Sequence, residues 1–378
     1  MKGFYSLIYL GCCTLLFNCS SEAPVEALFT EMDNARTGIA FVNELQYDKD
    51  FNVFNYRNFY NGGGVAVGDV NNDGYVDLYF TANQKSNRLY LNNGDWTFTD
   101  ITEKASVGGS QSWSTGVAMA DVNGDGLLDI YVSNSGDIKG DSRANEFFVN
   151  NGDGTFREEA ERWGIADQGL STHGVFFDYD RDGDLDLYVL NNSYRAIGTF
   201  NLEKSTREIR DPEGGDKLYR NDGDRFTDVS EAAGILGSEI GFGLGTTVGD
   251  VNGDGWLDVY ISNDFFEKDY LYINQGDGTF KESIEEHMRH TSFASMGADM
   301  ADINNDAAVD VFVTDMLPQG VRRLNQTTTF ENWDVYQNKL AWGYYHQFNR
   351  NMLHLNTAAG DFMEIGQLSG VEATDWSW

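Results

Sequence analysis

The chain has 378 residues, of which 41% are hydrophobic, and a formal net charge of −34 at pH 7. That length is enough for a large buried core, whereas the acidity excludes the usual electrostatic binding of nucleic acid, whose phosphates would be repelled. Only 3 prolines accompany 42 glycines, a composition that suits tight β-turns.

The first segment, "MKGFYSLIYLGCCTLLFNC", has one lysine, an apolar run and a terminal cysteine. This pattern predicts a signal peptide at residues 1–18, followed by a linker at 19–27. A cysteine at the junction predicts a bacterial lipoprotein at the outer membrane or cell surface, with Cys19 lipid-modified and membrane contact only through that anchor. Cleavage before Cys12, or a plain cleaved signal that gives a secreted or periplasmic protein, is the alternative.

Five short stretches further along the chain share one pattern of acidic and amide residues. They read "DVNNDGYVD" (69–77), "DVNGDGLLD" (121–129), "DYDRDGDLD" (178–186), "DVNGDGWLD" (250–258) and "DINNDAAVD" (302–310). Oxygen-only donors in a flexible loop suit Ca2+, which takes six to eight oxygens, and we expect about five such sites. The predicted side-chain ligands are Asp69, Asn71, Asp73, Asp77, Asp121, Asn123, Asp125, Asp129, Asp178, Asp180, Asp182, Asp186, Asp250, Asn252, Asp254, Asp258, Asp302, Asn304, Asp306 and Asp310.

The surroundings of these loops distinguish them from EF-hands, which need a bidentate glutamate at position 12 and flanking helices. Position 12 is apolar in all five loops, within runs such as "LYF" and "IYV" that predict buried strands. Each loop is followed by a β-hairpin pattern, for example "YLYINQGDGTFKES" (270–283). One unit of strand, loop, strand and hairpin recurs from near residues 64, 116, 174, 245 and 297. The sequence therefore predicts an all-β propeller of four-stranded blades over residues 28–378.

These loops and hairpins resemble FG-GAP/VCBS repeats, as in the propellers of integrin α-subunits. More closely, "YNGGGVAVGDVNNDGYVDLYF", "SFASMGADMADINND" and "RNMLHLN" resemble bacterial proteins of the cartilage-acidic-protein type, which often carry a downstream ASPIC/UnbV domain. The resemblance implies a seven-bladed propeller. We expect an incomplete ring here, because a partial repeat from residue 371 stops at Trp378, and "LFTEMDNARTGIAF" (28–41) resembles the last strand of a hairpin.

The five loops should differ in affinity. The third has four carboxylates among its ligands and should bind tightest, with Arg181 offsetting them only in part and Asp184 facing solvent. The fifth has Ala307 where the other loops have glycine. If that position has φ > 0, alanine costs on the order of 1 kcal/mol, and this site should be the weakest.

An aromatic insert, residues 315–351, separates the fifth loop from its hairpin. Its aromatic rings, with Arg and Asn nearby, suit the stacking and polar contacts of a sugar-binding surface, whereas aromatics packed onto the propeller are the alternative. The candidate ligand surface consists of Trp333, Trp342, Tyr344 and Tyr345. A second insert, residues 192–216, is charged and reads as a surface loop.

No catalytic motif of the hydrolase, zinc-protease or phosphate-loop kind is present in the sequence. A site among His287, His290, His346 and His354 is conceivable, with solvated or packed histidines as the alternative. Two functions remain. The first is a non-catalytic, calcium-stabilised module that binds a glycan or protein at the cell surface. The second is a carbohydrate-active enzyme, a lyase or hydrolase, with its site on the propeller or in a downstream domain. The second would need carboxylates outside the loops that converge with Arg or His.

Overall fold

The computed structural model describes residues 28–111, 113–136, 143–193, 206–327, 331–357 and 361–375. Within them the chain forms five antiparallel sheets of four strands, each with its strands in chain order. These sheets are the blades of a β-propeller, and the predicted all-β fold class is confirmed. The predicted signal peptide and Cys19 lie outside the described residues, as does Trp378.

The strands of the blades have the following bounds. Blade 1 has β1 (Val65–Gly68), β2 (Asp77–Phe80), β3 (Arg88–Asn92) and β4 (Phe98–Asp100). Blade 2 has β5 (Ser114–Ala120), β6 (Asp129–Asn134), β7 (Glu146–Asn150) and β8 (Phe156–Glu158). Blade 3 has β9 (Leu170–Phe177), β10 (Asp186–Asn192), β11 (Lys217–Asn221) and β12 (Phe226–Asp228). Blade 4 has β13 (Gly243–Gly249), β14 (Asp258–Asn263), β15 (Tyr270–Asn274) and β16 (Phe280–Glu282). Blade 5 has β18 (Gly297–Ala301), β19 (Asp310–Thr314), β21 (Met352–Asn356) and β22 (Phe362–Glu364).

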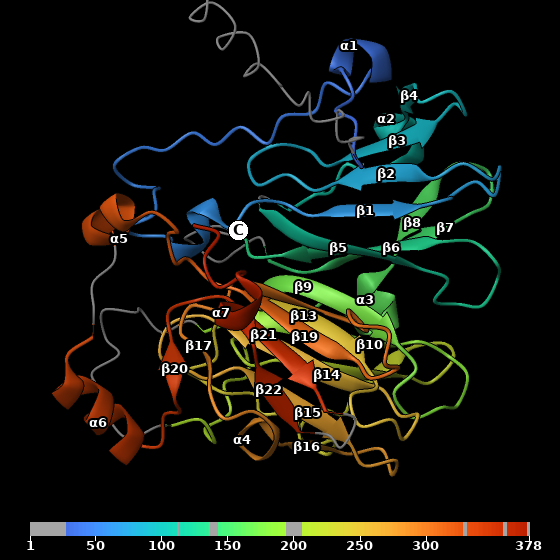
Figure 1. Ribbon diagram of the computed structural model, residues 1–378. Helices are drawn as coiled ribbons and strands as arrows, with labels where there is room; N and C mark the ends of the chain where they lie inside the picture. The colour runs from blue at the N-terminus through green and yellow to red at the C-terminus, as the bar shows by residue number, and fades with distance from the viewer. Residues whose placement is uncertain are drawn as a thin grey trace, which may run out of the picture.

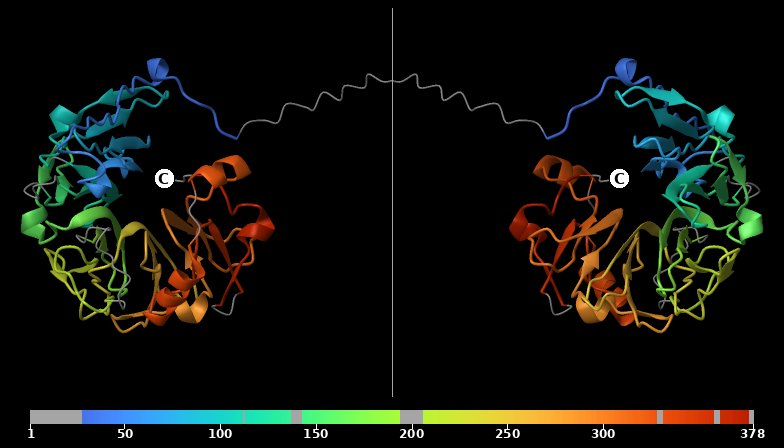
Figure 2. Two further views of the ribbon diagram at one scale, coloured as in Figure 1. Left: turned by 90° about the vertical axis from the view of Figure 1, so that its left-hand side faces the viewer. Right: turned by 90° about the vertical axis from the view of Figure 1, so that its right-hand side faces the viewer.

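The blades stand side by side as an open arc, which Figure 2 shows most clearly. Their first strands are innermost, and each contacts the first strand of the next blade, from β1 to β5, β9, β13 and β18. Four apolar clusters fill the spaces between successive blades. The second strands β6, β10 and β14 are buried along their whole length, which explains why their sequences are nearly continuous apolar runs.

Short helices follow the outer strands of four blades. They are α2 (Thr102–Ala105), α3 (Ala160–Trp163), α4 (Ile284–His287) and α7 (Gly366–Ser369). In each case an acidic residue at the end of the outer strand accepts a hydrogen bond from a backbone N–H in the first turn, as Glu282 does from Ile284. This contact satisfies one of the N–H groups that a helix start leaves free. Among the described residues, no helix is long and apolar enough to cross a membrane.

The insert of blade 5 contains α5 (Val321–Thr327), α6 (Trp333–Ala341) and β20 (Gln347–Phe348). Strand β20 pairs in parallel with β17 (Thr291–Ser292), which lies between blades 4 and 5 in the sequence. The inner strands run from one face of the arc to the other. Figure 1 shows α5 and α6 on the face where these strands begin and the five loops on the opposite face.

The N-terminal segment differs from the expected hairpin strand at 28–41. Residues Asn34–Thr37 form α1, because the Asp33 side chain accepts the Ala35 N–H at its start and Gly38, at φ 78°, ends it. The chain then runs along blade 1, where Asn43 donates to Asn83 at 2.8 Å. It continues through a 3-10 turn, Arg57–Tyr60, into β1. The strand prediction for this segment was therefore wrong.

Candidate metal centres and ligand surface

Each of the five loops connects the innermost strand of a blade to its second strand. The fourth and sixth positions both have a left-handed backbone, as at Gly253 (φ 73°) and Gly255 (φ 85°). The fourth loop shows how this turn gathers oxygens: Asp250 accepts the N–H groups of Gly253 and Gly255, at 2.8 and 2.7 Å. Asn252 Oδ1 likewise accepts the N–H of Asp254, at 2.9 Å. The side-chain oxygens that would bind the metal therefore point into the loop, as coordination of a hard cation requires.

The ninth-position aspartates Asp77, Asp129, Asp186, Asp258 and Asp310 are buried, at 1% exposure or less. In each one Oδ1 accepts a backbone N–H from the end of the third strand, and Oδ2 accepts the N–H of the second loop residue. Burial raises the pKa of Asp129 to about 6, and those of Asp186 and Asp258 to about 7. These carboxylates fasten the loop to the hairpin, and a cation beside them would favour their charged form.

The third loop brings three carboxylates together. Oxygens of Asp178, Asp180 and Asp186 lie within 4.8 Å of one another, and among the described residues no other group of three acidic, His or Cys side chains comes so close. Asp178 Oδ1 and Asp184 Oδ1 are buried without a hydrogen-bond partner in the described structure. Crowded like charges with orphaned oxygens are what a bound cation would satisfy, so the loop fits Ca2+.

Two neighbours of this cluster differ from the sequence-based prediction. Asp184 is half-buried rather than turned to solvent, and burial, followed by repulsion from Asp182, raises its pKa to about 6. Arg181 does not fold over its own loop. Its guanidinium lies 4.5 Å from the ring centroid of Trp256 and donates to the Gly255 carbonyl, so it joins the third loop to the fourth. The charge of the third loop is therefore less offset than the sequence indicated.

An asparagine that was not predicted from the sequence links the blades. Asn150, Asn221, Asn274 and Asn356 each end a third strand and are buried. Each side-chain amide donates to a carbonyl of its own loop and to the second-position carbonyl of the preceding loop, for example from Asn274 to Tyr179 at 2.8 Å. The available signal was the asparagine at the same place in every hairpin motif, as in "YLYIN" and "MLHLN".

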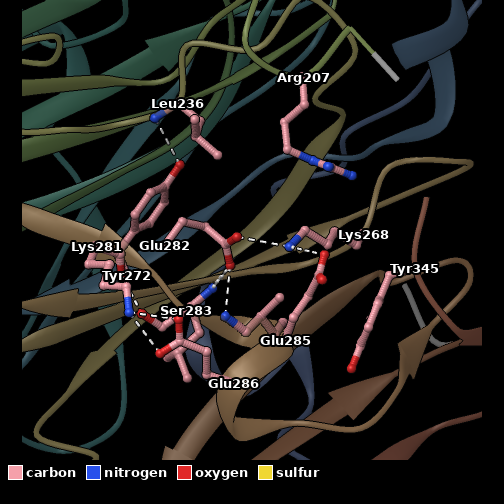
Figure 3. Close-up of polar contacts among 12 residues, drawn as sticks. Arg207, Leu236, Lys268, Tyr272, Lys281, Glu282, Ser283, Glu285, Glu286 and Tyr345 are labelled. Carbon is pink, nitrogen blue, oxygen red and sulfur yellow. Dashed lines mark hydrogen bonds and ion pairs between the residues drawn. The ribbon is translucent and has the colours of Figure 1, made fainter. Parts of the chain in front are cut away.

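The insert of blade 5 is anchored beside blade 4 by hydrogen bonds to backbone carbonyls and by an aromatic ring next to the buried Lys268. Lys268, 2% exposed, donates to Glu282 and Glu285 at 2.8 and 2.9 Å, with the ring of Tyr345 beside it (Figure 3). The backbone carbonyl of the neighbouring Glu267 accepts from Gln347 of the insert, at 2.9 Å. Tyr345 itself donates to the Met288 carbonyl at 2.8 Å. Much of the insert therefore packs on the propeller.

Part of the predicted ligand surface is engaged in this packing. Tyr344 is 7% exposed and so cannot stack on a ligand from solvent, which corrects its assignment. Trp342 and Tyr345 are intermediate in exposure, and only Trp333, at 70%, stands clear of the fold.

Trp333 is the first of three aromatic rings in a row, and the other two were not part of the predicted ligand surface. Its centroid lies 5.6 Å from that of Tyr336, which lies 6.3 Å from that of Phe348, itself 40% exposed. We call Trp333, Tyr336 and Phe348 the aromatic surface. At its edge, Arg350 donates to Glu364 at 2.8 Å and lies over the Phe348 ring.

The four histidines of the candidate histidine site each have different neighbours. His346 shares a 2.6 Å hydrogen bond with Tyr336, and His290 lies 3.5 Å from Glu364. His354 is 1% exposed, and burial lowers its pKa to about 3, so it is neutral. His287 lies in α4. Among the described residues, these side chains do not form a group of metal-ligating atoms.

Comparison with known proteins identifies the repeats. A model of the FG-GAP-like repeat matches residues 69–132, 135–189, 209–261 and 250–313, which together make up more than half of the chain. Cartilage acidic protein 1 of Xenopus tropicalis is 32% identical over 207 residues, which are 54% of this chain and 29% of that protein. The human protein of the same name is 28% identical over 239 residues, 62% of this chain and 33% of that protein. The matched region thus spans about a third of the length of these relatives.

Two solved structures share features of the architecture at low identity. A lectin of Agrocybe aegerita that recognises non-reducing terminal N-acetylglucosamine gives a TM-score of 0.43 at 15% identity, over 79% of this chain and 64% of that one. The V. cholerae biofilm matrix protein Bap1 gives 0.39 at 12% identity, over 82% of this chain and 40% of that one. Likenesses of this size carry no argument about function.

Proposed function

This chain belongs to the FG-GAP-like repeat family, and we propose that it is a calcium-stabilised module, exported from the cell, that binds a glycan without catalysing a reaction. The N-terminal pattern of residues 1–19 supports export and lipid attachment at Cys19. The third loop supports the calcium role, because its carboxylates converge and leave buried oxygens without partners.

The observation that carries glycan binding is the aromatic surface. Trp333 and Phe348 expose 70% and 40% of their area, although Tyr344 and Gln347 of the same insert are buried. Sugar rings stack their C–H faces on such rings and use nearby polar groups for orientation. Arg350 supplies a donor beside Phe348, and its 2.8 Å ion pair with Glu364 holds it in place.

The enzyme alternative has weaker support at this place. Glu364 does converge with Arg350 and His290, but its side chain is 8% exposed. It also accepts the Gly366 N–H, and hydrogen bonds together with Arg350 hold its pKa below the usual value despite burial. A glycosidase needs two carboxyl groups across the scissile bond, one of them protonated. Glu364 is a single ionised carboxylate at the start of α7, which suits a role in positioning Arg350.

The test is a glycan-binding screen of the calcium-loaded protein, followed by titration of any ligand found. Trp333→Ala should weaken binding by about two- to tenfold, because one stacking ring contributes roughly 0.5–1.5 kcal/mol. Trp96→Ala is the matched control, since Trp96 is 63% exposed on the hairpin of blade 1. Absence of any glycan binding by the wild type, or equal loss in both variants, would refute the proposal.

A further inference from the structure

A cavity of about 220 Å³ lies where the inner strands begin, at the opposite end from the cation loops. All five blades contribute to its wall, through the segment before β1 and through Thr115, Thr172, Leu244 and Met296. Its volume is far larger than the ~10–15 Å³ that a single water requires. The inner strands begin on the same side of the arc that carries α5 and α6 of the insert (Figure 1). We call it the axial cavity.

One residue of the wall breaks the pattern of the repeats. Five residues before the first loop aspartate, four blades have glycine (Gly64, Gly116, Gly245 and Gly297), and blade 3 has His173. Glycine is used there because neighbouring strands approach closely: a Cβ on Gly64 would lie 2.9 Å from the Thr115 carbonyl, and one on Gly245 would lie 2.8 Å from Gly297 Cα. The imidazole of His173 lies over the preceding blade, with Nδ1 2.7 Å from the place of a Cβ on Gly116. Blade 3 therefore has a large polar side chain at the position where the other four blades have glycine.

The polar groups of the wall divide into satisfied and unsatisfied ones. Thr115 donates to the carbonyls of Ser133 and Ser171, and Thr172 is bonded in the same way between blades 3 and 4. By contrast, the Asn61 amide nitrogen is buried without a partner within the described residues. The ring of His173 has no hydrogen bond to the part of the chain that the structure describes, although the surrounding strands shield it enough to lower its pKa. Buried polar groups are normally paired, so the Asn61 amide calls for a partner, and the half-buried ring of His173 leaves its nitrogens available to a ligand in the cavity.

The wall also restricts the chemistry of that ligand. Among the described residues that line it there is no Asp, Glu, Lys or Arg, so a charged ligand would lose its hydration without gaining a counter-charge. His173 is neutral at pH 7 and can both donate and accept, and Asn61 Nδ2 donates. Leu244 of blade 4 and Met296 of blade 5 add apolar groups to the same wall.

We propose that the axial cavity binds a small neutral polyhydroxyl ligand, a single sugar residue in size, which hydrogen-bonds to His173 and Asn61 and rests its C–H face on Leu244 and Met296. This site is distinct from the aromatic surface and does not depend on it. His173 stands where the other four blades have glycine, and it supplies the imidazole that hydrogen-bonds to the ligand.

Imidazole resonances of 15N-labelled protein provide the test, because the chain has only 5 histidines and His173→Gly identifies one of them by its absence. This variant should fold, since glycine occupies the same position in four blades. The probes are glucose, galactose, mannose, fucose and N-acetylglucosamine at up to roughly 50 mM, which saturates even millimolar sites. At least one sugar should shift the His173 resonance, and the shift should persist in Trp333→Ala.

Affinity for that sugar should fall by about three- to tenfold in His173→Gly and in Asn61→Ala, as expected for one lost neutral hydrogen bond, and less in His173→Gln. If none of the sugars moves the His173 resonance, the proposal is wrong. It is equally wrong if only zinc ion or inorganic phosphate moves it. Loss of the shift in Trp333→Ala would assign the sugar to the aromatic surface instead.

Discussion

One buried position before the third strand of each blade is Asn in three blades and Asp in two. In blade 2, Asn145 contacts the hydroxyls of Tyr131 and Ser171, both at 2.9 Å. In blade 4, Asp269 makes the equivalent contacts with Tyr260 and Ser295, at 2.6 and 2.8 Å. The two side chains have nearly the same shape. They differ in charge, because Asn145 is always neutral, whereas Asp269 can ionise at a position that water does not reach.

Asp269→Asn should therefore flatten the pH dependence of stability. Burial raises the pKa of Asp269 to about 7 in the folded protein, above its value of about 3.9 in the unfolded chain. The folded state then binds the proton more tightly, so stability falls as pH rises from about 4 to 7 and stays low above it. Thermal melts at pH 5 and pH 8 should show that the variant gains on the wild type at pH 8.

A suitable control for this comparison is Asp50→Asn, because the Asp50 side chain is 79% exposed. The calcium concentration is kept constant, and it affects the variant and the wild type alike because their five loops are identical. Parallel pH profiles of Asp269→Asn and wild type would show that the raised pKa does not influence stability.

The sixth loop position supplies the second residue-scale prediction. Ala307 has φ 69°, the left-handed region that costs a residue with a Cβ about 1 kcal/mol, as the sequence comparison of the loops indicated. Ala307→Gly should raise the free energy of unfolding by about that amount and tighten calcium binding at the fifth loop. Urea unfolding in EGTA isolates the backbone effect from metal binding.

The reverse substitution gives the matched control. Gly74 in the first loop has φ 87°, and a Cβ there would meet nothing within 4 Å, so Gly74→Ala changes strain without a clash. It should lower stability by about the amount that Ala307→Gly raises it, roughly 1 kcal/mol. Effects of the same sign in the two variants would contradict the strain argument.

At the scale of elements, the asparagine links hold successive blades together. Asn274 is 2% exposed and donates to Tyr179 of the blade 3 loop and Leu257 of its own, while its Oδ1 accepts the Gly276 N–H. Asn274→Ala should destabilise the protein by about 2–4 kcal/mol, because several buried backbone groups lose their partner at once. Denaturant unfolding of the calcium-loaded protein measures this loss.

Asn92 is the control, because it occupies the same place in blade 1 but its amide donates only to Val76 of its own loop. Asn92→Ala should cost clearly less, since Asn92 is also less buried. Equal losses at the two positions would mean that the link between blades contributes nothing.

Local signals explain which elements could be predicted from the sequence. The loop between β13 and β14 and the hairpin of β15 and β16 were predictable because their turn residues and alternating apolar residues are neighbours in the chain. The partner of Asn274 was not, because Tyr179 lies 95 residues away. Tyr344 and Trp333 are aromatic residues of the same insert, and only tertiary packing buries the first and leaves the second exposed.

At the scale of the whole molecule, the arc places five acidic loops at one end of its inner strands in a chain of net charge −34. Mutual repulsion opposes the folded state there, and five bound Ca2+ would neutralise about ten charges at the point of greatest crowding. Mg2+ demands a smaller, near-octahedral site and gives up its water reluctantly, so flexible oxygen loops of this kind should discriminate against it.

The melting temperature of residues 20–378 should therefore be high in calcium, fall by several degrees or more in EGTA, and stay low in EGTA with excess magnesium. KCl at matched ionic strength separates site binding from general screening, which acts on exposed charges alike whatever the cation. Asp180→Asn gives the third loop the amide that the other four have at that position, and in a calorimetric titration it should lower the affinity of the third site to that of the other loops. If KCl stabilises as well as calcium does, the loops act only through their net charge. If calcium has no effect at all, they are closed by their backbone hydrogen bonds alone, and the orphaned oxygens of Asp178 and Asp184 need another partner.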